Sequence, residues 1–301
     1  MAPVKKRVGL ALVAGVVALT LAAVPVLPPA GAVTTRALGA SLALLSPGDH
    51  RESLQWGGLT RTYIVHVPPG RALMNRPLIL VYHGATDTDT ITIATTDFEQ
   101  VADRTGDVVA FLQGYSNTWD ELAGHTPAAQ HHIDDIGYTA AVLAALSPLV
   151  GYNTSRVAVT GLSNGALMVE TLGCHLASKI RLIVPVEGEL ASAVSPSCAP
   201  SRPINVLEIH GTADPSIPYN GGVFIGVGGA VSVLSARATV ARWAHLDRCA
   251  TGPVTTPGRG ITLTRFTRCH SGVSVTLRTI VGGVHVWGSN IGELVTVALG
   301  H

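Results

Sequence analysis

The feature that most constrains the fold of this chain is a serine flanked by glycines, in the run Gly161-Leu162-Ser163-Asn164-Gly165. An apolar run at 156–160 precedes it, and a helix-like run at 166–170 follows it. This pattern predicts a strand, a sharp turn and a helix, with the serine hydroxyl exposed at the carboxyl edge of a sheet. Glycines are expected because side chains there would collide with the neighbouring strand and helix. The pattern is typical of a nucleophile elbow, with an ordinary glycine turn as the alternative.

Apolar strands and helices alternate along the rest of the chain. Strands are expected at 61–67, 78–82, 107–112, 181–186, 204–210 and 274–281, and helices at 97–104, 134–150, 233–247 and 289–299. Strands that are apolar throughout and separated by helices are typical of a parallel sheet covered on both faces. The sequence therefore predicts an α/β fold with a mostly parallel central sheet and helices on both faces. Ligands bind such sheets outside the carboxyl ends of the strands.

The first 32 residues have the pattern of a signal peptide. A basic start at 5–7 precedes an apolar run from 8 to about 27, and a small-x-small cleavage site ends at Ala32. The alternative is an uncleaved membrane anchor, because the run approaches the ~20 residues that span a bilayer. Prolines near the end of the run favour the signal peptide. We therefore expect a secreted or cell-envelope protein without stable membrane insertion after cleavage.

The remaining chain is expected to hold one domain. Residues 33–50 carry little charge and predict an N-terminal arm, and residues 51–301 predict a single catalytic domain. Removing residues 1–32 takes away three basic residues and no acidic ones, so the formal charge of +1 becomes weakly negative. No basic cluster remains that could bind a phosphate backbone, which argues against a nucleic-acid partner.

The four cysteines all lie in the exported part of the chain, where an oxidising compartment favours disulfides. They are Cys174, Cys198, Cys249 and Cys269. Three pairings are possible. Sequential pairing would close two loops of some twenty residues, each worth about 3 kcal/mol on the chain-entropy description. Free buried thiols are the alternative, and the spacing of a zinc site is absent.

A nucleophilic serine needs a histidine to accept its proton and an acid to orient that histidine. Asp214 follows the strand at 204–210 in a glycine- and proline-containing turn, on the same expected edge as Ser163. Glu187 and Glu189, after the preceding strand, are the alternatives. His285 follows the last strand through two glycines, which places it on a loop at that edge. We expect Asp214 as the acid and His285 as the base.

The tetrahedral oxyanion needs two N–H donors. The residue after the nucleophile, Asn164, supplies one, and the loop after the strand at 78–82 is expected to supply the other from Ala85. The neighbouring His83 is expected to be a structural loop residue rather than a base.

Four blocks of the sequence together resemble the secreted polyhydroxybutyrate depolymerase and feruloyl esterase family, including LpqC-like esterases. They are His83-Gly84, Gly161-Leu162-Ser163-Asn164-Gly165, His210-Gly211-Thr212-Ala213-Asp214 with Pro218-Tyr219, and Gly282-Gly283-Val284-His285-Val286-Trp287. The resemblance implies an α/β-hydrolase fold, a Ser163–Asp214–His285 triad, no cofactor and the sequential disulfides. The chain departs from the family's usual residues at Ala85, Ala166 and Val284.

Two further groups of residues invite interpretation. A metal cluster is not expected from His125, His131, His132, Asp134 and Asp135, because helix capping and solvent exposure account for them. Three aromatic residues could form the walls of a substrate pocket or pack in the core, namely Trp119, Tyr219 and Trp287.

These observations predict a secreted serine esterase that hydrolyses carboxylic esters through an acyl-enzyme. A small or oligomeric ester is the expected substrate, and a monomer the expected state. One alternative is a cell-envelope acyltransferase with the same triad. The other is a catalytically silent binding protein on the hydrolase scaffold, against which the complete set of site residues argues.

Overall fold

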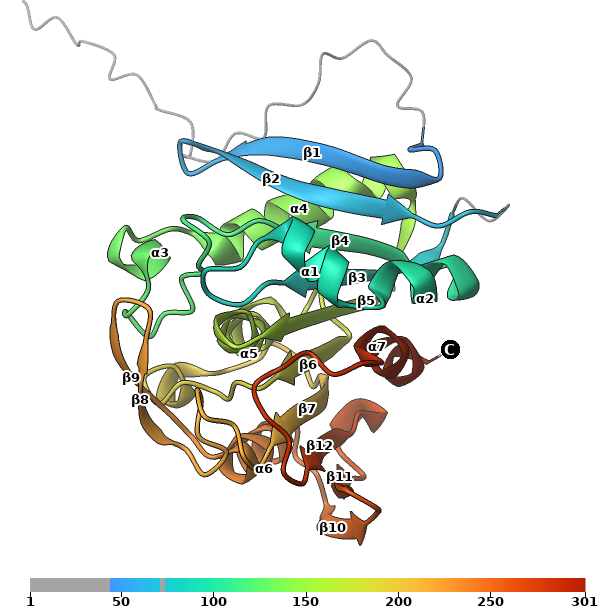
Figure 1. The fold of residues 1–301 in the computed structure, drawn as a ribbon. Coiled ribbons are helices and arrows are strands. Elements are labelled where there is room, and N and C mark those ends of the chain that lie inside the picture. The colour runs from blue at the N-terminus through green and yellow to red at the C-terminus, as the bar shows by residue number, and fades with distance from the viewer. Residues whose placement is uncertain (1–43, 71–73, 301) are drawn as a thin grey trace, which may run out of the picture. The chain divides into compact units, whose positions relative to one another are not determined.

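The apolar runs of the sequence become the middle of one large sheet (Figure 1). The computed structural model describes residues 44–70 and 74–300, so the predicted signal peptide and most of the predicted N-terminal arm lie outside the described residues. In the described part, ten strands lie in the order β1-β2-β4-β3-β5-β6-β7-β12-β11-β10. Their bounds are β1 Gly48–Trp56, β2 Leu59–Val67, β3 Arg76–Tyr82, β4 Val108–Leu112, β5 Tyr152–Leu162, β6 Leu182–Val186, β7 Asn205–Gly211, β10 Thr251–Pro257, β11 Ile261–Thr267 and β12 Val275–Ile280.

The six central strands, β4, β3, β5, β6, β7 and β12, run parallel. Every residue of β3, β4 and β6 is buried, as expected for strands covered on both faces. Parallel strands place their carboxyl ends at one edge, so the segments that follow β3, β5, β7 and β12 meet there. These segments contain the predicted catalytic residues.

Helices cover both faces of this sheet, as the sequence predicts. The helices are α1 Asp89–Thr95, α2 Phe98–Thr105, α3 Pro127–Gln130, α4 Asp135–Val150, α5 Asn164–Leu176, α6 Ala236–Leu246 and α7 Ile291–Leu299. One core cluster joins the sheet to α4, α5 and α6 through residues such as Leu146, Leu172 and Val240. A second cluster joins it to α2 and α7 through Phe98 and Val295. The two faces therefore have separate hydrophobic cores.

Antiparallel strands extend the sheet at both ends. β1 and β2 pair with each other, and β2 continues onto β4. At the other end β12, β11 and β10 form a meander. The predicted arm at 33–50 therefore ends earlier than expected, because residues 48–50 already belong to β1. Most side chains of β1 are polar and only Leu54 is buried, so the segment lacks the apolar pattern that predicts a strand.

A separate hairpin lies beside the sheet. Its strands are β8, Gly222–Gly226, and β9, Gly229–Val233. The sequence analysis did not predict it, because glycines at both strand ends and in the turn obscure the strand pattern. This hairpin becomes one wall of the site described below.

Both disulfides are present with the sequential pairing, Cys174–Cys198 and Cys249–Cys269. The first joins α5 to the segment after β6, and the second joins the segment after α6 to the segment after β11. No helix in the described residues is both long and apolar enough to cross a membrane.

Candidate active site

Ser163 lies at the junction of β5 and α5, in strained backbone with a φ of 59°. Few residues other than glycine adopt such a positive φ. The Ser163 N–H donates to the carbonyl of Val186 at 3.0 Å, and the Ser163 carbonyl accepts from Ala166 at 2.8 Å and Leu167 at 3.1 Å. Hydrogen bonds to β6 and to the first turn of α5 therefore fix the turn that carries the hydroxyl.

The two glycines of the elbow are required by close backbone contacts. A Cβ on Gly161 would lie 2.3 Å from the Gly165 carbonyl oxygen. A Cβ on Gly165 would lie 2.4 Å from the Tyr82 oxygen and 2.6 Å from the His83 oxygen. Real Cβ atoms do not approach backbone oxygens so closely. A side chain at either glycine would therefore collide with neighbouring backbone, as expected from the sequence. The predicted order of strand, turn and helix around Ser163 is confirmed.

Asp214 and His285 are brought together at the same edge. His285 Nδ1 lies 2.7 Å from Asp214 Oδ2, and the other carboxylate oxygen accepts from the N–H groups of Ser216 at 2.7 Å and Ile217 at 3.0 Å. Burial alone would raise the pKa of Asp214, but hydrogen bonds from His210, His285 and the Ser216 amide together hold this pKa well below its usual range. An ionised Asp214 keeps the proton on His285 Nδ1 and leaves Nε2 free to accept one.

The two glutamates considered as alternative acids have other partners. Glu187 accepts hydrogen bonds from the Gly211 N–H at 3.1 and 2.9 Å. Glu189 Oε1 lies 3.1 Å from Nδ1 of the buried His210. Within the described residues, Asp214 is the carboxylate paired with His285.

A cluster of buried carboxyl groups lies behind Asp214. Burial raises the pKa of Glu187 to about 8 and that of Glu170 to about 7. It also raises the pKa values of Glu189 and Glu208 well above their usual range. His210 lies among them, with Nε2 3.3 Å from Asp214 Oδ2. Because desolvation penalises the charged form, these glutamates hold protons at higher pH than exposed ones do.

The loop after β3 passes directly beside Ser163. A Cβ on Gly84 would lie 3.6 Å from the Ser163 Cβ, an ordinary van der Waals distance. Ala85, Ser163 and Asn164 line the same cavity. Asn164 is the first residue of α5, so helix geometry gives its N–H no intrahelical partner. The two predicted oxyanion donors are thus brought to one place.

His83 and Trp119 hold this loop in place. His83 donates from Nδ1 to the Gly84 carbonyl at 2.8 Å and accepts at Nε2 from the Gly114 N–H at 3.0 Å. Burial lowers the pKa of His83. The fully buried Trp119 donates from Nε1 to the His83 carbonyl at 2.9 Å. His83 is therefore structural, as expected.

The Asn164 side chain has a role that the sequence analysis missed. Its Oδ1 accepts from the Trp119 N–H at 2.8 Å, and its Nδ2 donates to Glu121 Oε2 at 2.9 Å. Asn164 therefore joins α5 to the loop between β4 and α3.

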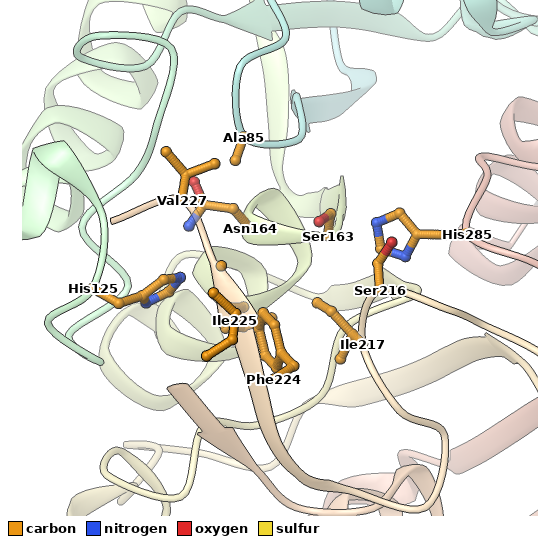
Figure 2. A pocket seen from close by; sticks show the side chains of 12 residues that line it. Ala85, His125, Ser163, Asn164, Ser216, Ile217, Phe224, Ile225, Val227 and His285 are labelled. Carbon is orange, nitrogen blue, oxygen red and sulfur yellow. The ribbon is translucent and has the colours of Figure 1, made fainter. Parts of the chain in front are cut away.

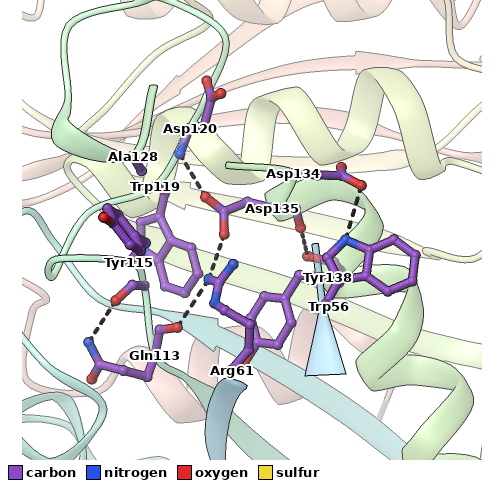
Figure 3. Close-up of polar contacts among 12 residues, drawn as sticks. Trp56, Arg61, Gln113, Tyr115, Trp119, Asp120, Ala128, Asp134, Asp135 and Tyr138 are labelled. Carbon is purple, nitrogen blue, oxygen red and sulfur yellow. Dashed lines mark hydrogen bonds and ion pairs between the residues drawn. The ribbon is translucent and has the colours of Figure 1, made fainter. Parts of the chain in front are cut away.

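A second set of contacts holds that loop against the sheet (Figure 3). The buried Asp135 pairs with Arg61 and accepts from the Asp120 N–H at 2.8 Å. Burial raises the pKa of Asp135 to about 6, against the opposing effect of Arg61. Asp134 caps α4 by accepting from the Gly137 N–H at 2.7 Å. Of the two aspartates expected to cap this helix, Asp134 does so, whereas Asp135 is the first helical residue and its side chain pairs with Arg61 instead.

A cavity of about 400 Å³ opens at Ser163 (Figure 2). Ser163 and His285 both line it, and the β8–β9 hairpin forms much of an apolar wall. Its lining residues are Ala85, His125, Ser163, Asn164, Leu167, Ser216, Ile217, Phe224, Ile225, Gly226, Val227 and His285. The structure therefore adds a hairpin and a loop histidine to the residues predicted from the sequence.

The expectation that His125 is solvent-exposed is wrong. The side chain is 5% exposed, and Nδ1 lies 2.7 Å from Oε1 of the fully buried Glu121. The spacing of four residues between Glu121 and His125 is the one signal in the sequence that could have suggested the pair. His131 and His132 are exposed, as expected.

Two of the three aromatic residues proposed as pocket walls lie elsewhere. Trp119 is packed in the core against Tyr82, and Tyr219, 8% exposed, bonds through its hydroxyl to Thr279 Oγ1 at 2.8 Å. Neither lines the cavity at Ser163, so that expectation is wrong for both. Trp287 lines a second cavity of about 480 Å³, which also has His285 in its wall.

Two groups of described residues bring possible cation ligands within 4.8 Å of one another. One is Asp49, His66 and Glu99, and the other is Glu187, His210 and Asp214. Neither group includes any of the five residues that the sequence analysis considered as a metal cluster. The second group lies within the buried cluster behind Asp214, where its members already contact one another.

Solved structures with the same arrangement of sheet and helices define the fold. Acetyl xylan esterase from Aspergillus awamori matches with a TM-score of 0.60 at 14% identity, over 80% of this chain and 94% of that one. S-formylglutathione hydrolase from Agrobacterium tumefaciens matches with a TM-score of 0.52 at 14% identity, over 89% and 95%. The chain has the α/β-hydrolase fold, as predicted.

Proteins that are similar in sequence bear on the activity as well as on the fold. No family model matches the chain. It is 28% identical to feruloyl esterase B of Piromyces equi over 216 residues, which cover 70% of this chain and 40% of that protein. It is 27% identical to NocK, described as an esterase, of Nocardia uniformis subsp. tsuyamanensis over 314 residues, covering 95% and 91%. The chain thus spans less than half of the first relative and most of the second. These relatives and the shared fold support a carboxylic ester hydrolase.

Proposed function

We propose that the protein hydrolyses carboxylic esters through an acyl-enzyme formed on Ser163. The observation that carries this proposal is the His285–Asp214 pair, 2.7 Å apart, in the wall of the cavity that also contains the strained Ser163. A serine hydroxyl is a weak nucleophile until a neighbouring base accepts its proton. His285 Nε2 is that base, because Nδ1 is committed to Asp214.

The reaction runs in two halves. Ser163 Oγ attacks the ester carbonyl carbon as its proton passes to His285 Nε2, and the N–H groups of Asn164 and Ala85 bind the resulting oxyanion. His285 then protonates the leaving alcohol as the C–O bond breaks. Water repeats these steps on the acyl-enzyme, and the acid leaves with Ser163 restored. Asp214 stabilises the imidazolium in both halves.

The position of His285 orients the substrate. Because His285 must protonate the leaving oxygen, the alcohol part of the ester lies on its side of Ser163. The second cavity, with His285 and Trp287 in its wall, is the natural site for that alcohol. The acyl part then extends the other way, along Leu167 and the hairpin.

We extend the proposal to a secreted enzyme that acts on short or oligomeric esters, as the resemblance to polyhydroxybutyrate depolymerases and feruloyl esterases implies. Two disulfides support export, because disulfides persist in oxidising compartments. The names of two similar proteins described above, a feruloyl esterase and an acetyl xylan esterase, support a feruloyl or acetyl ester as the substrate class.

Replacement of the nucleophile tests the proposal. Ser163→Ala should lower the turnover of p-nitrophenyl butyrate by about a million-fold, because triad members act as a unit. Its melting temperature should match that of the wild type. Residual activity of more than a few per cent would contradict the assignment of Ser163. A panel of p-nitrophenyl esters, methyl ferulate and hydroxybutyrate oligomers would then identify the acyl group.

A further inference from the structure

We propose that the end of the sheet formed by β10, β11 and β12 docks on membranes that contain anionic lipids. Arginine side chains there bind lipid phosphates, and exposed valines beside them reach the boundary of the acyl chains. Such binding is peripheral and goes beyond the ester hydrolysis proposed for Ser163, so each can be tested without the other.

Positive charge is not balanced by acidic residues at this end of the sheet. No aspartate or glutamate occurs between Asp247 and Glu293. Asp247 is fully buried, and Glu293 pairs with Arg104 at 3.0 Å. We define residues 248–280 as the basic meander, and its arginines are Arg248, Arg259, Arg265, Arg268 and Arg278. They are spread along the sequence, but the three strands and their connections bring them to one end of the sheet (Figure 1).

The arginines of the basic meander lack acidic partners. Elsewhere arginines pair with acids, as Arg61 does with Asp135. In the basic meander, all of which the structure describes, no arginine has such a partner. Arg278 Nε is buried and has no hydrogen-bond partner among the described residues. Guanidinium groups without a carboxylate are available to phosphate, which they bind through two parallel N–H···O bonds.

Two of these arginines lie close together on one face of the sheet. Arg265 is opposite Thr276 and Arg278 is opposite Leu263, so the two arginines are diagonal neighbours on antiparallel strands. Long side chains at diagonal positions can reach the same group. Both arginines line a cavity of about 380 Å³, which residues of β7 and α7 also line. One lipid phosphate can therefore contact both guanidinium groups.

The face that carries these two arginines is accessible. α6 packs on the other face of the meander, where Val275 and Leu277 belong to the core. α7 packs mainly on β5 and β6. β10 is exposed along nearly its whole length. A membrane surface can therefore approach Arg265 and Arg278 without displacing any part of the described chain.

Exposed apolar side chains lie beside the arginines. Val254 on β10 is directly opposite Arg265 and is 56% exposed. Val297 on α7 is 57% exposed and lines the same cavity as Arg265 and Arg278. Cationic side chains next to apolar ones bind the boundary between lipid headgroups and acyl chains. Each arginine near an anionic membrane surface strengthens that binding.

Lipids match this surface better than other anionic partners do. A nucleic acid or an acidic polysaccharide can satisfy the guanidinium groups, but it has no acyl chains to cover Val254 and Val297. Single-stranded nucleic acids also bind through aromatic stacking. The basic meander has one Phe, Tyr or Trp residue, Phe266, and this side chain packs against the core.

The docking surface and the Ser163 cavity use opposite ends of the same strands. Asn205, which begins β7, and Ser274, which precedes β12, line the cavity at the basic meander. Asp214 and His285 follow the carboxyl ends of these two strands. Docking should therefore leave the Ser163 cavity open to esters dissolved in water.

Sedimentation with lipid vesicles tests the inference. The full-length protein is mixed with vesicles of phosphatidylcholine, or of an equimolar mixture with phosphatidylglycerol, at low and at high salt. At low salt the partition coefficient should be at least about ten-fold higher on the mixed vesicles, and high salt should remove most of this difference by screening. A protein that binds neither kind of vesicle, or binds heparin alone, would overturn the inference.

Hydrogen exchange on the bound protein locates the contact. Backbone amides of β10 and β11 should exchange more slowly on the mixed vesicles than on phosphatidylcholine, whereas those of β1, at the other end of the sheet, should not. If the apolar run near the N-terminus holds the protein equally on both kinds of vesicle, this comparison still decides. Unchanged exchange in β10 and β11 would overturn the inference.

Charge reversal then assigns the binding to the basic meander. Arg265→Glu should lower the partition coefficient on mixed vesicles about ten-fold while the melting temperature is unchanged. Arg237→Glu is the matched control, because Arg237 is an exposed arginine of α6 and its reversal changes the net charge equally. The control should lower the partition coefficient less than about three-fold. Equal effects of the two reversals would mean that net charge alone governs binding, and would overturn the assignment.

Discussion

The two walls of the Ser163 cavity are built in different ways. The catalytic edge, which we define as Ser163, Asp214 and His285, lies at the carboxyl ends of β5, β7 and β12. The hairpin wall, which we define as β8–β9, lies outside the ten-stranded sheet. Its residues Val223 and Ile225 are 67% and 80% exposed. The first wall is built on strands in the middle of the sheet, whereas the second is joined to the segment after β6 by a short backbone contact, with hydrogen bonds between Ser192 and Ser232 and between Leu234 and Leu190.

The two walls should differ in how well they tolerate substitutions. At the elbow, Gly161 and Gly165 leave no room for a single methyl group. On the hairpin, an exposed side chain can change without displacing any neighbour. Reaction chemistry should therefore be insensitive to the hairpin, whereas substrate choice should depend on it.

Among substitutions at the two walls, Asp214→Asn in the catalytic edge should have the largest effect on activity. Turnover should fall by up to about ten-thousand-fold with little change in KM, because an amide favours the wrong histidine tautomer and does not stabilise the imidazolium. Steady-state kinetics with p-nitrophenyl butyrate measure it. Glu189→Gln, which removes a carboxyl group from the buried cluster, is the control. It should lower turnover by less than about ten-fold. The reverse ranking would move the acid to the segment after β6.

Gly165→Ala should give the next largest effect, now on stability. Its Cβ would press on the carbonyl oxygens of Tyr82 and His83 at 2.4 and 2.6 Å, and relief requires a backbone shift. Such overpacking costs about 1–3 kcal/mol or more. Gly84→Ala is the matched control, since its nearest neighbours would be 3.6 Å away. Equal denaturant midpoints for the two variants would show that the elbow is less tightly built than described.

The buried carboxyls beneath the catalytic edge predict a dependence of stability on pH. Burial raises the pKa of Glu187 to about 8 from a usual 4.5, so between these values the folded protein holds a proton that the unfolded chain releases. The free energy of unfolding should therefore fall as pH rises through this window, by at most about 1.4 kcal/mol per pH unit.

Glu187→Gln isolates this contribution. The variant should lose stability less steeply than the wild type between pH 5 and pH 8, as urea unfolding at a series of pH values would show. Other buried carboxyls add to the slope of both proteins, so the comparison is the difference between them. Parallel slopes would mean that Glu187 is ionised in the folded protein.

The smallest effect is expected on the hairpin wall. Ile225→Ser alters a side chain that is 80% exposed, so stability should change by less than about 0.5 kcal/mol. The KM for longer acyl chains should rise a few-fold while kcat for p-nitrophenyl acetate is unchanged. A loss of activity toward the acetate would mean that the hairpin also supports the catalytic edge.

The sequence predicted the catalytic edge better than the hairpin wall for physical reasons. Buried parallel strands appear in the sequence as continuous apolar runs, and the elbow glycines mark positions where a side chain would collide with backbone. Ser163, Asp214 and His285 could therefore be placed on one edge of the sheet. The hairpin combines glycines with exposed apolar residues and has no clear period.

Aromatic and polar residues in loops were harder to place. Trp119 and Tyr219 lie in loops near the site, and composition alone does not distinguish a cavity wall from a core. The burial of His125 depends on Glu121 and on a hairpin a hundred residues later in the chain, neither of which local sequence describes. Tertiary contacts decide such positions.

The two ends of the sheet have a consequence for the behaviour of the protein in concentrated solution. Outer strands expose unpaired N–H and C=O groups that can recruit other chains into fibrous aggregates. β10 contains Pro253 and Pro257, which have no N–H to offer, and its register shifts between Thr251 and Val254. β1 exposes the charged Asp49 and Arg51. Proline in one outer strand and charged side chains in the other make strand-to-strand polymerisation unfavourable, so the protein should stay dispersed at high concentration.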